Sequence, residues 1–223
     1  MKQLVKRLVK GRYNGLNELD RQLEAYVDYD GGFFVELGAN DGVTQSNSLY
    51  FEKYRGWRGV LVEPSPHNFL KCRANRSTAS RVFCAACVSF DYQPEFVRIT
   101  YSNLMSVPQG LESDIADAKA HASAGRAFLQ AHEEIFDFGA VAQPLNALLL
   151  EAQAPKMIDF LSLDVEGAEI EVLKGVDHEQ FRFKYILVEC RSLPTMRDYL
   201  GAHGYRLVKN LSGHDYLFTS RSG

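Results

Sequence analysis

Short apolar runs alternate with helical patterns along most of the chain. Apolar runs that are typical of buried strands occur at 31–38, 59–64, 80–89, 155–167 and 184–190. Apolar residues at helical spacing follow or separate them at 46–54, 65–75, 168–176 and 193–204. This alternation predicts an α/β fold with a mostly parallel sheet and helices on both of its faces. Residues 205–219 predict a C-terminal antiparallel hairpin that turns at Ser212 and Gly213.

Two regions fit the alternation less well. A helical pattern at 16–29 precedes the first strand, so we predict an N-terminal helical segment at 1–30 and a single domain at 31–223. Residues 94–101 predict an extra strand, and residues 110–138 are mostly helix-forming but alanine-rich, with a weak apolar stripe. We therefore expect a variable insertion at about 92–140, which would be either a lid over a site or a surface addition.

Composition and charge limit the partners. The 223 residues are 46% hydrophobic and carry a net charge of −3, so we expect no nucleic-acid partner. No apolar run approaches the length of a membrane span. The basic start at 1–14 is weakly amphipathic, which is typical of a solvated terminal helix or of surface attachment. The four cysteines and the lack of a secretory signal favour a cytoplasmic protein, and the pattern gives no prediction of oligomeric state.

The turn after the first strand has an unusual mixture of glycines and acids. It reads VELGANDGVTQSN, with Gly38 and Gly42 flanked by Glu36 and Asp41. A GxGxxG dinucleotide turn would need glycine at Asn40 and at position 43, so a pyrophosphate ligand is disfavoured. Carboxylates suit a cationic ligand, and S-adenosylmethionine has a sulfonium, an ammonium and no phosphate.

Acids also end three further strands. Glu63 lies 25 positions after Gly38, near the interval at which an acid meets ribose hydroxyls in nucleotide folds. Asp164 and Glu189 follow later apolar runs. Because ligands bind beyond the carboxyl ends of parallel strands, these acids predict a cleft lined by carboxylates. The alternative is that each is a solvated strand-end acid.

Two blocks, FVELGANDGVTQSNSLYFEKYRGWRGVLVEPSP and IDFLSLDVEGAEIEVLKGV, resemble the FkbM-type methyltransferases over residues 33 to 219. The resemblance implies a class I, Rossmann-like methyltransferase that uses S-adenosylmethionine, and many such enzymes methylate hydroxyls of sugars or small molecules. It implies that Glu63 binds the ribose and that Asp164, Glu166 and Gly167 form the second block. The first cofactor motif and its surroundings would comprise Glu36, Gly38, Ala39, Asn40, Asp41, Gly42, Ser46, Asn47 and Pro64.

Methylation of a hydroxyl requires a base or a metal, since an alcohol is a poor nucleophile at neutral pH. We predict Asp164, Glu166 and His214 as catalytic candidates. Glu166 has the alternative role of stabilising the N-terminus of the following helix. Asp164 and Glu189 could share Mg²⁺ or Mn²⁺. Arg191 would either clamp an anionic substrate or form a surface ion pair.

We therefore predict an S-adenosylmethionine-dependent O-methyltransferase that acts on a small-molecule or glycan substrate. Two alternatives remain open. One is an NAD-dependent sugar oxidoreductase on a similar fold, against which the broken glycine fingerprint argues. The other is a non-catalytic binding protein with a methyltransferase fold.

Overall fold

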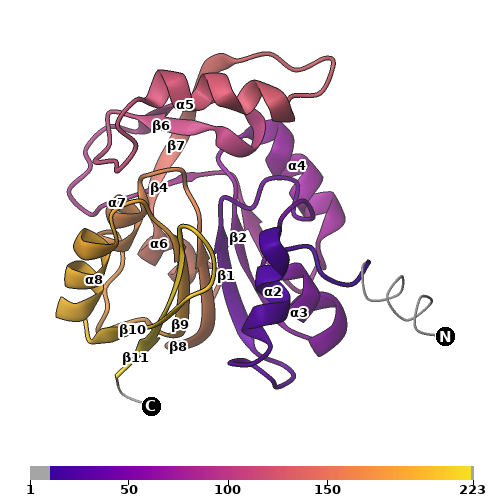
Figure 1. The fold of residues 1–223 in the computed structure, drawn as a ribbon, viewed down its shortest axis with the longest axis vertical. Helices are drawn as coiled ribbons and strands as arrows, with labels where there is room; N and C mark the ends of the chain where they lie inside the picture. Colours follow the sequence, from indigo (N-terminus) through magenta and orange to yellow (C-terminus); the bar gives the residue numbers. More distant parts are fainter. Residues whose placement is uncertain (1–10, 222–223) are drawn as a thin grey trace.

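The computed structural model describes residues 11–221 (Figure 1). The prediction of a terminal helix at the basic start of the chain falls mostly on residues 1–10, which lie outside the described residues. Among the described residues, no helix combines the length and the apolar character needed to cross a membrane.

The main sheet is mostly parallel, as predicted. Its strands follow the order β10-β11-β9-β8-β1-β2-β3. Within the run β9-β8-β1-β2-β3, each strand is parallel to the next. Strand β11 pairs antiparallel with both β9 and β10. The bounds are β1 Phe33–Leu37, β2 Arg58–Val62, β3 Arg81–Phe83, β8 Met157–Leu163, β9 Arg182–Glu189, β10 Tyr205–Asn210 and β11 Asp215–Ser220. The carboxyl ends of the central parallel strands thus share one edge.

Helices cover both faces of this sheet (Figure 1). One face packs against α2 (Leu19–Leu23), α3 (Leu49–Arg55) and α4 (Pro66–Asn75) through a core centred on Phe34, Phe51 and Phe160. The other packs against α6 (Leu145–Glu151), α7 (Glu169–Leu173) and α8 (Leu193–Ala202). Successive side chains of a strand point to opposite faces, so Phe34 joins the first core and Val35 the second. The predicted fold class is confirmed.

A second, smaller sheet lies over the carboxyl ends of the main strands, at the top of Figure 1. Its strand order is β4-β7-β5-β6. The short helices η2, α5 and η3 connect its strands and contact one another. The bounds are β4 Ala86–Val88, β5 Phe96–Tyr101, η2 Asn103–Met105, β6 Val107–Gln109, α5 Ala118–Ala124, η3 Gly125–Phe128 and β7 Phe136–Pro144.

Three predicted elements differ from the structure. The helix predicted at 16–29 is a 3-10 turn, η1 (Leu16–Glu18), followed by α2, and it ends at Leu23. The strand predicted at 80–89 is two strands, since β3 ends at Phe83 and β4 leaves the main sheet to pair with β7. The region 110–138 is not mostly helical. Only α5 and η3 are helical there, and β7 begins at Phe136, where apolar and polar residues alternate.

Candidate functional site

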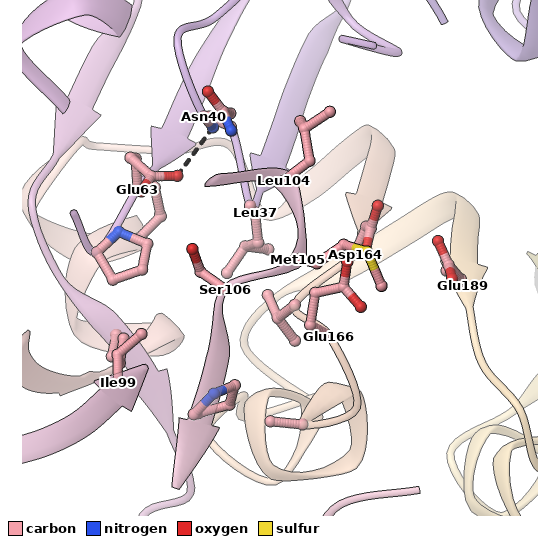
Figure 2. A pocket seen from close by; sticks show the side chains of 18 of the residues that line it. Leu37, Asn40, Glu63, Ile99, Leu104, Met105, Ser106, Asp164, Glu166 and Glu189 are labelled. Carbon is pink, nitrogen blue, oxygen red and sulfur yellow. Dashed lines mark hydrogen bonds between the residues drawn. The ribbon is translucent and has the colours of Figure 1, made fainter. Parts of the chain in front are cut away.

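A cavity of about 300 Å³ lies between the two sheets, at the carboxyl ends of β1, β2, β8 and β9. The second sheet and its connecting helices contribute Ile99, Leu104, Met105, Phe128 and His121 to its wall. Figure 2 shows Asn40 and Glu63 on one side of the cavity and Asp164, Glu166 and Glu189 on the other. The acids predicted at strand ends therefore do converge on one space.

Glu63 follows β2 and is buried. Its Oε2 accepts a hydrogen bond from the backbone N–H of Asn40 (2.8 Å), and its Oε1 accepts one from the N–H of Ser65 (2.9 Å). Burial raises the pKa of Glu63 to about 7, although the two N–H donors oppose this shift. Each carboxylate oxygen retains acceptor capacity for a further donor, such as a ribose hydroxyl.

Glu36 lies at the same edge but is satisfied within the protein. The alternation along β1 directs it towards α3 and α4, where its Oε2 meets Arg76 Nη1 at 3.1 Å. The same oxygen accepts from the hydroxyls of Ser46 and Ser48, and Oε1 accepts from the N–H of Asn47. Glu36 lines the cavity, yet it holds the loop after β1 in place rather than offering a free charge.

Position 38 has no room for a side chain, because the segment that follows β8 lies close to its backbone. Its φ is +76°, and a Cβ atom there would lie 1.9 Å from the carbonyl oxygen of Asp164. In a cofactor-binding turn, a glycine is expected where a ligand approaches the backbone closely. The structure gives a different reason, which is the close approach of the segment that follows β8.

Three carboxylates form an acidic cluster (Asp164, Glu166 and Glu189) on the opposite side of the cavity. One oxygen from each lies within 4.8 Å of the others. Burial and then the charge of Glu189 raise the pKa of Asp164 well above its ordinary value. The same two causes raise that of Glu166 to about 8. Burial, followed by the charge of Asp215, also raises the pKa of Glu189. Such a cluster favours bound protons or a cationic ligand.

Asp164 is the member of the acidic cluster with an unsatisfied hydrogen-bond acceptor among the described residues. Its Oδ1 is buried and has no hydrogen-bond partner among the described residues. A buried acceptor without a donor is costly, so the cavity is suited to a ligand that supplies a positive or hydrogen-bonding group there.

Glu166 occupies a strained turn. It has φ of +56°, a left-handed conformation that is uncommon for a residue other than glycine. Glu169 stabilises the turn by accepting hydrogen bonds from the N–H groups of Val165 and Gly167. His121 of α5 brings its Nε2 to within 2.7 Å of Glu166 Oε2, and burial lowers the pKa of this histidine.

Arg191 pairs with acids rather than facing solvent alone. Its guanidinium lies 3.4 Å from Glu166, 3.6 Å from Glu189 and 3.6 Å from Asp114. Arg191 forms these ion pairs in the wall of the cavity, and its role as a clamp for an anionic substrate stays a prediction. It partly neutralises the acidic cluster.

The remaining predicted residues divide into two groups. Ala39, Asn40, Ser46 and Pro64 line the cavity. Four others do not: Asp41, Gly42, Asn47 and His214. Asp41 instead accepts hydrogen bonds from the N–H groups of Val43 and Thr44, and Asn47 donates to the hydroxyl of Ser162. His214 is exposed in the β10–β11 turn, and its catalytic role stays a prediction.

Sequence reasoning missed Arg76 and His121. Arg76 follows α4 and is 40 positions from Glu36, while His121 is 45 positions from Glu166. No local pattern signals either pairing, because each depends on how separate elements pack.

The sequence matches the family model described as the methyltransferase FkbM domain, over residues 36–207. The chain belongs to the FkbM methyltransferase family. It is therefore a methyltransferase, and the family implies use of S-adenosylmethionine. The resemblance noted from the two sequence blocks is confirmed.

Several solved methyltransferase structures are similar to this FkbM domain at low identity. The precorrin-6y C5,15-methyltransferase from Geobacter metallireducens GS-15 is 13% identical, with a TM-score of 0.44 over 91% of this chain and 85% of that chain. The N-terminal domain of human METTL16 is 13% identical, with a TM-score of 0.41 over 92% of this chain and 67% of that chain. These likenesses are too distant to bear on the substrate. No curated protein matched the chain.

The residues present fit the methyl donor. Glu63 offers acceptors for a ribose diol, and Asp164 offers a buried acceptor for a cationic group that is unpartnered within residues 11–221. The acidic cluster also has the all-oxygen donor set that Mg²⁺ and Mn²⁺ prefer.

Proposed function

We propose that this FkbM methyltransferase methylates a hydroxyl group of a sugar or of a sugar-containing metabolite. One observation carries the proposal. The acidic cluster, with raised pKa values, faces Glu63 across a single cavity. A hydroxyl needs a proton acceptor when it attacks, and the acidic cluster supplies carboxylates whose raised pKa values make them stronger bases than ordinary acids.

The methyl donor would bind in the cavity between Glu63 on one side and the acidic cluster on the other. When bound, S-adenosylmethionine supplies a methyl group on a sulfonium that leaves as a neutral thioether. Glu63 would accept hydrogen bonds from the ribose, while Ala39, Asn40, Ser46 and Pro64 would form the surrounding wall. Glu36 would contribute by fixing the loop that contains Ser46.

Glu166 and Asp164 are the proposed proton acceptors. With a pKa of about 8, the Glu166 carboxyl is a stronger base than an ordinary glutamate once it is ionised, and its ionised fraction increases as the pH rises towards 8. His121 lies beside Glu166 in the cavity wall, whereas the sequence-derived candidate His214 lies in an exposed turn. His121 and His214 are both candidates, and their separate substitution distinguishes them.

A divalent cation is the alternative means of activating the hydroxyl. Asp164 and Glu189 would hold Mg²⁺ or Mn²⁺, with Glu166 as a third ligand. Such an ion would lower the pKa of the acceptor hydroxyl.

The acceptor class rests on size and polarity. The cavity is small, and Asn103, Arg191 and His121 add polar groups to walls that also carry Leu104 and Met105. This mixture suits a polyol with apolar C–H faces. The net charge of −3 differs from the basic excess that is typical of nucleic-acid-binding domains, which supports a small-molecule acceptor. The four cysteines are free thiols, which supports the proposed cytoplasmic setting.

The first test is calorimetry with S-adenosylhomocysteine and with NAD. We expect saturable binding of S-adenosylhomocysteine and none of NAD. The reverse result would favour the oxidoreductase alternative. Failure of both to bind folded protein would refute the proposed donor site.

The second test is transfer of an isotope-labelled methyl group to a panel of free sugars, nucleotide sugars and glycosides. Asp164→Asn should abolish transfer while the protein still binds S-adenosylhomocysteine. His121→Gln and His214→Gln form a matched pair that distinguishes the two histidines. Transfer to amines in preference to hydroxyls would refute the acceptor class, and the absence of any transfer with bound donor would favour the binding-protein alternative.

A further inference from the structure

Two histidines and one glutamate converge outside the cavity. His67 is the second residue of α4, and His132 and Glu133 lie in the segment between η3 and β7. One ligand atom from each side chain lies within 4.8 Å of the other two. The three residues come from segments that are more than sixty positions apart, so the packing of the insertion against α4 brings them together.

These three side chains do not satisfy one another. Among the described residues, no hydrogen bond or ion pair joins either imidazole to Glu133. Both histidines are exposed and are free to adjust their rotamers. Ligand atoms that surround Zn²⁺ at about 2.1 Å lie about 3.4 Å apart in a tetrahedron. The three ligand atoms observed here would therefore have to move closer together by roughly 1 Å to bind the ion.

Glu133 is already held in a fixed orientation. Its Oε1 accepts a hydrogen bond from the Tyr101 hydroxyl at 2.8 Å, and its Oε2 accepts from Asn103 Nδ2 at 2.9 Å and from the Gln130 N–H at 2.8 Å. A carboxylate has about four lone-pair positions, so one acceptor position remains. Although burial opposes it, these donors and Lys71 lower the pKa of Glu133, which keeps the carboxylate ionised. Hydrogen bonds of this kind orient metal ligands in known sites.

We propose that His67, His132 and Glu133 form a zinc site that ties the insertion to α4. Two imidazoles and one carboxylate are a donor set of zinc proteins, in which water takes the fourth position. Mg²⁺ and Ca²⁺ prefer oxygen ligands and would not select this set. Lys71, one helical turn after His67, places a positive charge nearby and weakens the site.

The zinc site is connected to the donor cavity by hydrogen bonds. Asn103, which donates to Glu133, accepts a bond from Asn40 Nδ2 at 3.3 Å. The backbone N–H of Asn40 donates in turn to Glu63 at 2.8 Å. Asn103 also lines the cavity, next to Leu104 and Met105. Zinc would therefore stabilise the cavity wall and tighten donor binding. This second part rests on the proposed function, whereas zinc binding itself does not.

The direct test is a zinc titration of metal-free protein in competition with a chromophoric chelator. We expect one zinc per chain, a loss of affinity of about tenfold or more in His67→Ala and in His132→Ala, and no change in His214→Ala. Lys71→Met should bind zinc more tightly. Because the substituted histidines are exposed, the variants should fold normally. Equal zinc affinity in the wild type and in the His67→Ala/His132→Ala double variant would overturn the site.

X-ray absorption at the zinc edge on the wild-type protein gives a second, mutation-free measurement. Two imidazole ligands and oxygen ligands are expected. Oxygen ligands alone would assign the zinc to the acidic cluster, and a sulfur shell at about 2.3 Å would assign it to cysteine. Either result would refute the proposed site.

Binding of S-adenosylhomocysteine with and without zinc tests the coupling. We expect zinc to tighten this binding several-fold in the wild type and to have no effect in the double variant. Zinc binding at the histidines without that change would refute the coupling but retain the site. If S-adenosylhomocysteine does not bind at all, the proposed function fails while the zinc titration still decides the site.

Discussion

Arg76→Met removes the buried cation that joins Glu36 to Glu52. The Arg76 side chain is 0% exposed, and the two glutamate side chains are 6% and 5% exposed. Nη1 lies 3.1 Å from Glu36, Nε lies 3.1 Å from Glu52, and Nη2 donates to Ser48 at 2.8 Å. Methionine fills most of the same volume but leaves two carboxylates without a countercharge.

The expected cost is large because the charges are buried. Breaking a buried ion pair by removing one partner costs about 3–5 kcal/mol. Taking about 4 kcal/mol, the melting temperature of a chain of this length should fall by roughly 10 °C. Arg81→Met is the matched control, since Arg81 pairs with Glu151 at 2.9 Å but both side chains are more than half exposed. We expect the control to cost less than about 1 kcal/mol.

Urea unfolding followed by circular dichroism measures these costs, and calorimetry with S-adenosylhomocysteine measures the effect on the site. Glu36→Gln separates the two roles discussed for Glu36. If Glu36 mainly orders the loop after β1, Glu36→Gln should lower stability and should be strongly non-additive with Arg76→Met. If Arg76→Met costs no more than Arg81→Met, or if Glu36→Gln weakens ligand binding without loss of stability, the structural role assigned to Glu36 is wrong.

Three further predictions concern the cavity. Gly38→Ala should cost about 3 kcal/mol or more in urea unfolding, because the new Cβ would clash with the Asp164 carbonyl at a position that already has a positive φ. Gly31→Ala is the control: its φ is +74° but the space around it is open, so it should cost about 1–2 kcal/mol. Equal costs for the two variants would exclude the clash. Glu63→Gln should weaken S-adenosylhomocysteine by about 2 kcal/mol, roughly thirtyfold in calorimetry, because hydrogen bonds to a charged group are lost; unchanged affinity would remove Glu63 from the ribose site. The folded chain holds the Glu166 proton up to a pKa of about 8, whereas the unfolded chain releases it near 4.5, so stability should fall as pH rises between these values, by roughly a few kcal/mol in total. Glu166→Gln should flatten that slope in unfolding experiments at several pH values, and a slope that persists unchanged would contradict the assignment.

The parts of the site that the sequence predicted are those that depend on local order. A strand places its last residue at the edge of the sheet, and parallel strands share that edge. Glu63, Asp164 and Glu189 could therefore be assigned to one cavity from their positions alone. The hairpin at 205–219 was predictable for a similar reason, since its turn residues lie between two alternating runs.

The predictions of secondary structure were wrong where the pairing or packing of a segment depends on distant parts of the chain. The run at 80–89 is uniformly apolar, and periodicity cannot reveal that β4 leaves the main sheet to pair with β7. The alanine-rich region at 110–138 has helix propensity throughout, yet most of it lacks an apolar face to pack against a core. Propensity was therefore overridden by the packing of the second sheet.

The sequence alone determined the fold class, the family and the position of the acids at strand ends, because periodicity, glycine turns and motif spacing are encoded within short stretches. Only the tertiary structure decided how those acids are used. It paired Glu36 with the distant Arg76 and left Asp164 with an oxygen that has no partner in the described part of the chain. It also brought His121 to Glu166 and His67 to Glu133. Such contacts depend on the packing of elements far apart in the chain, and no local pattern specifies them.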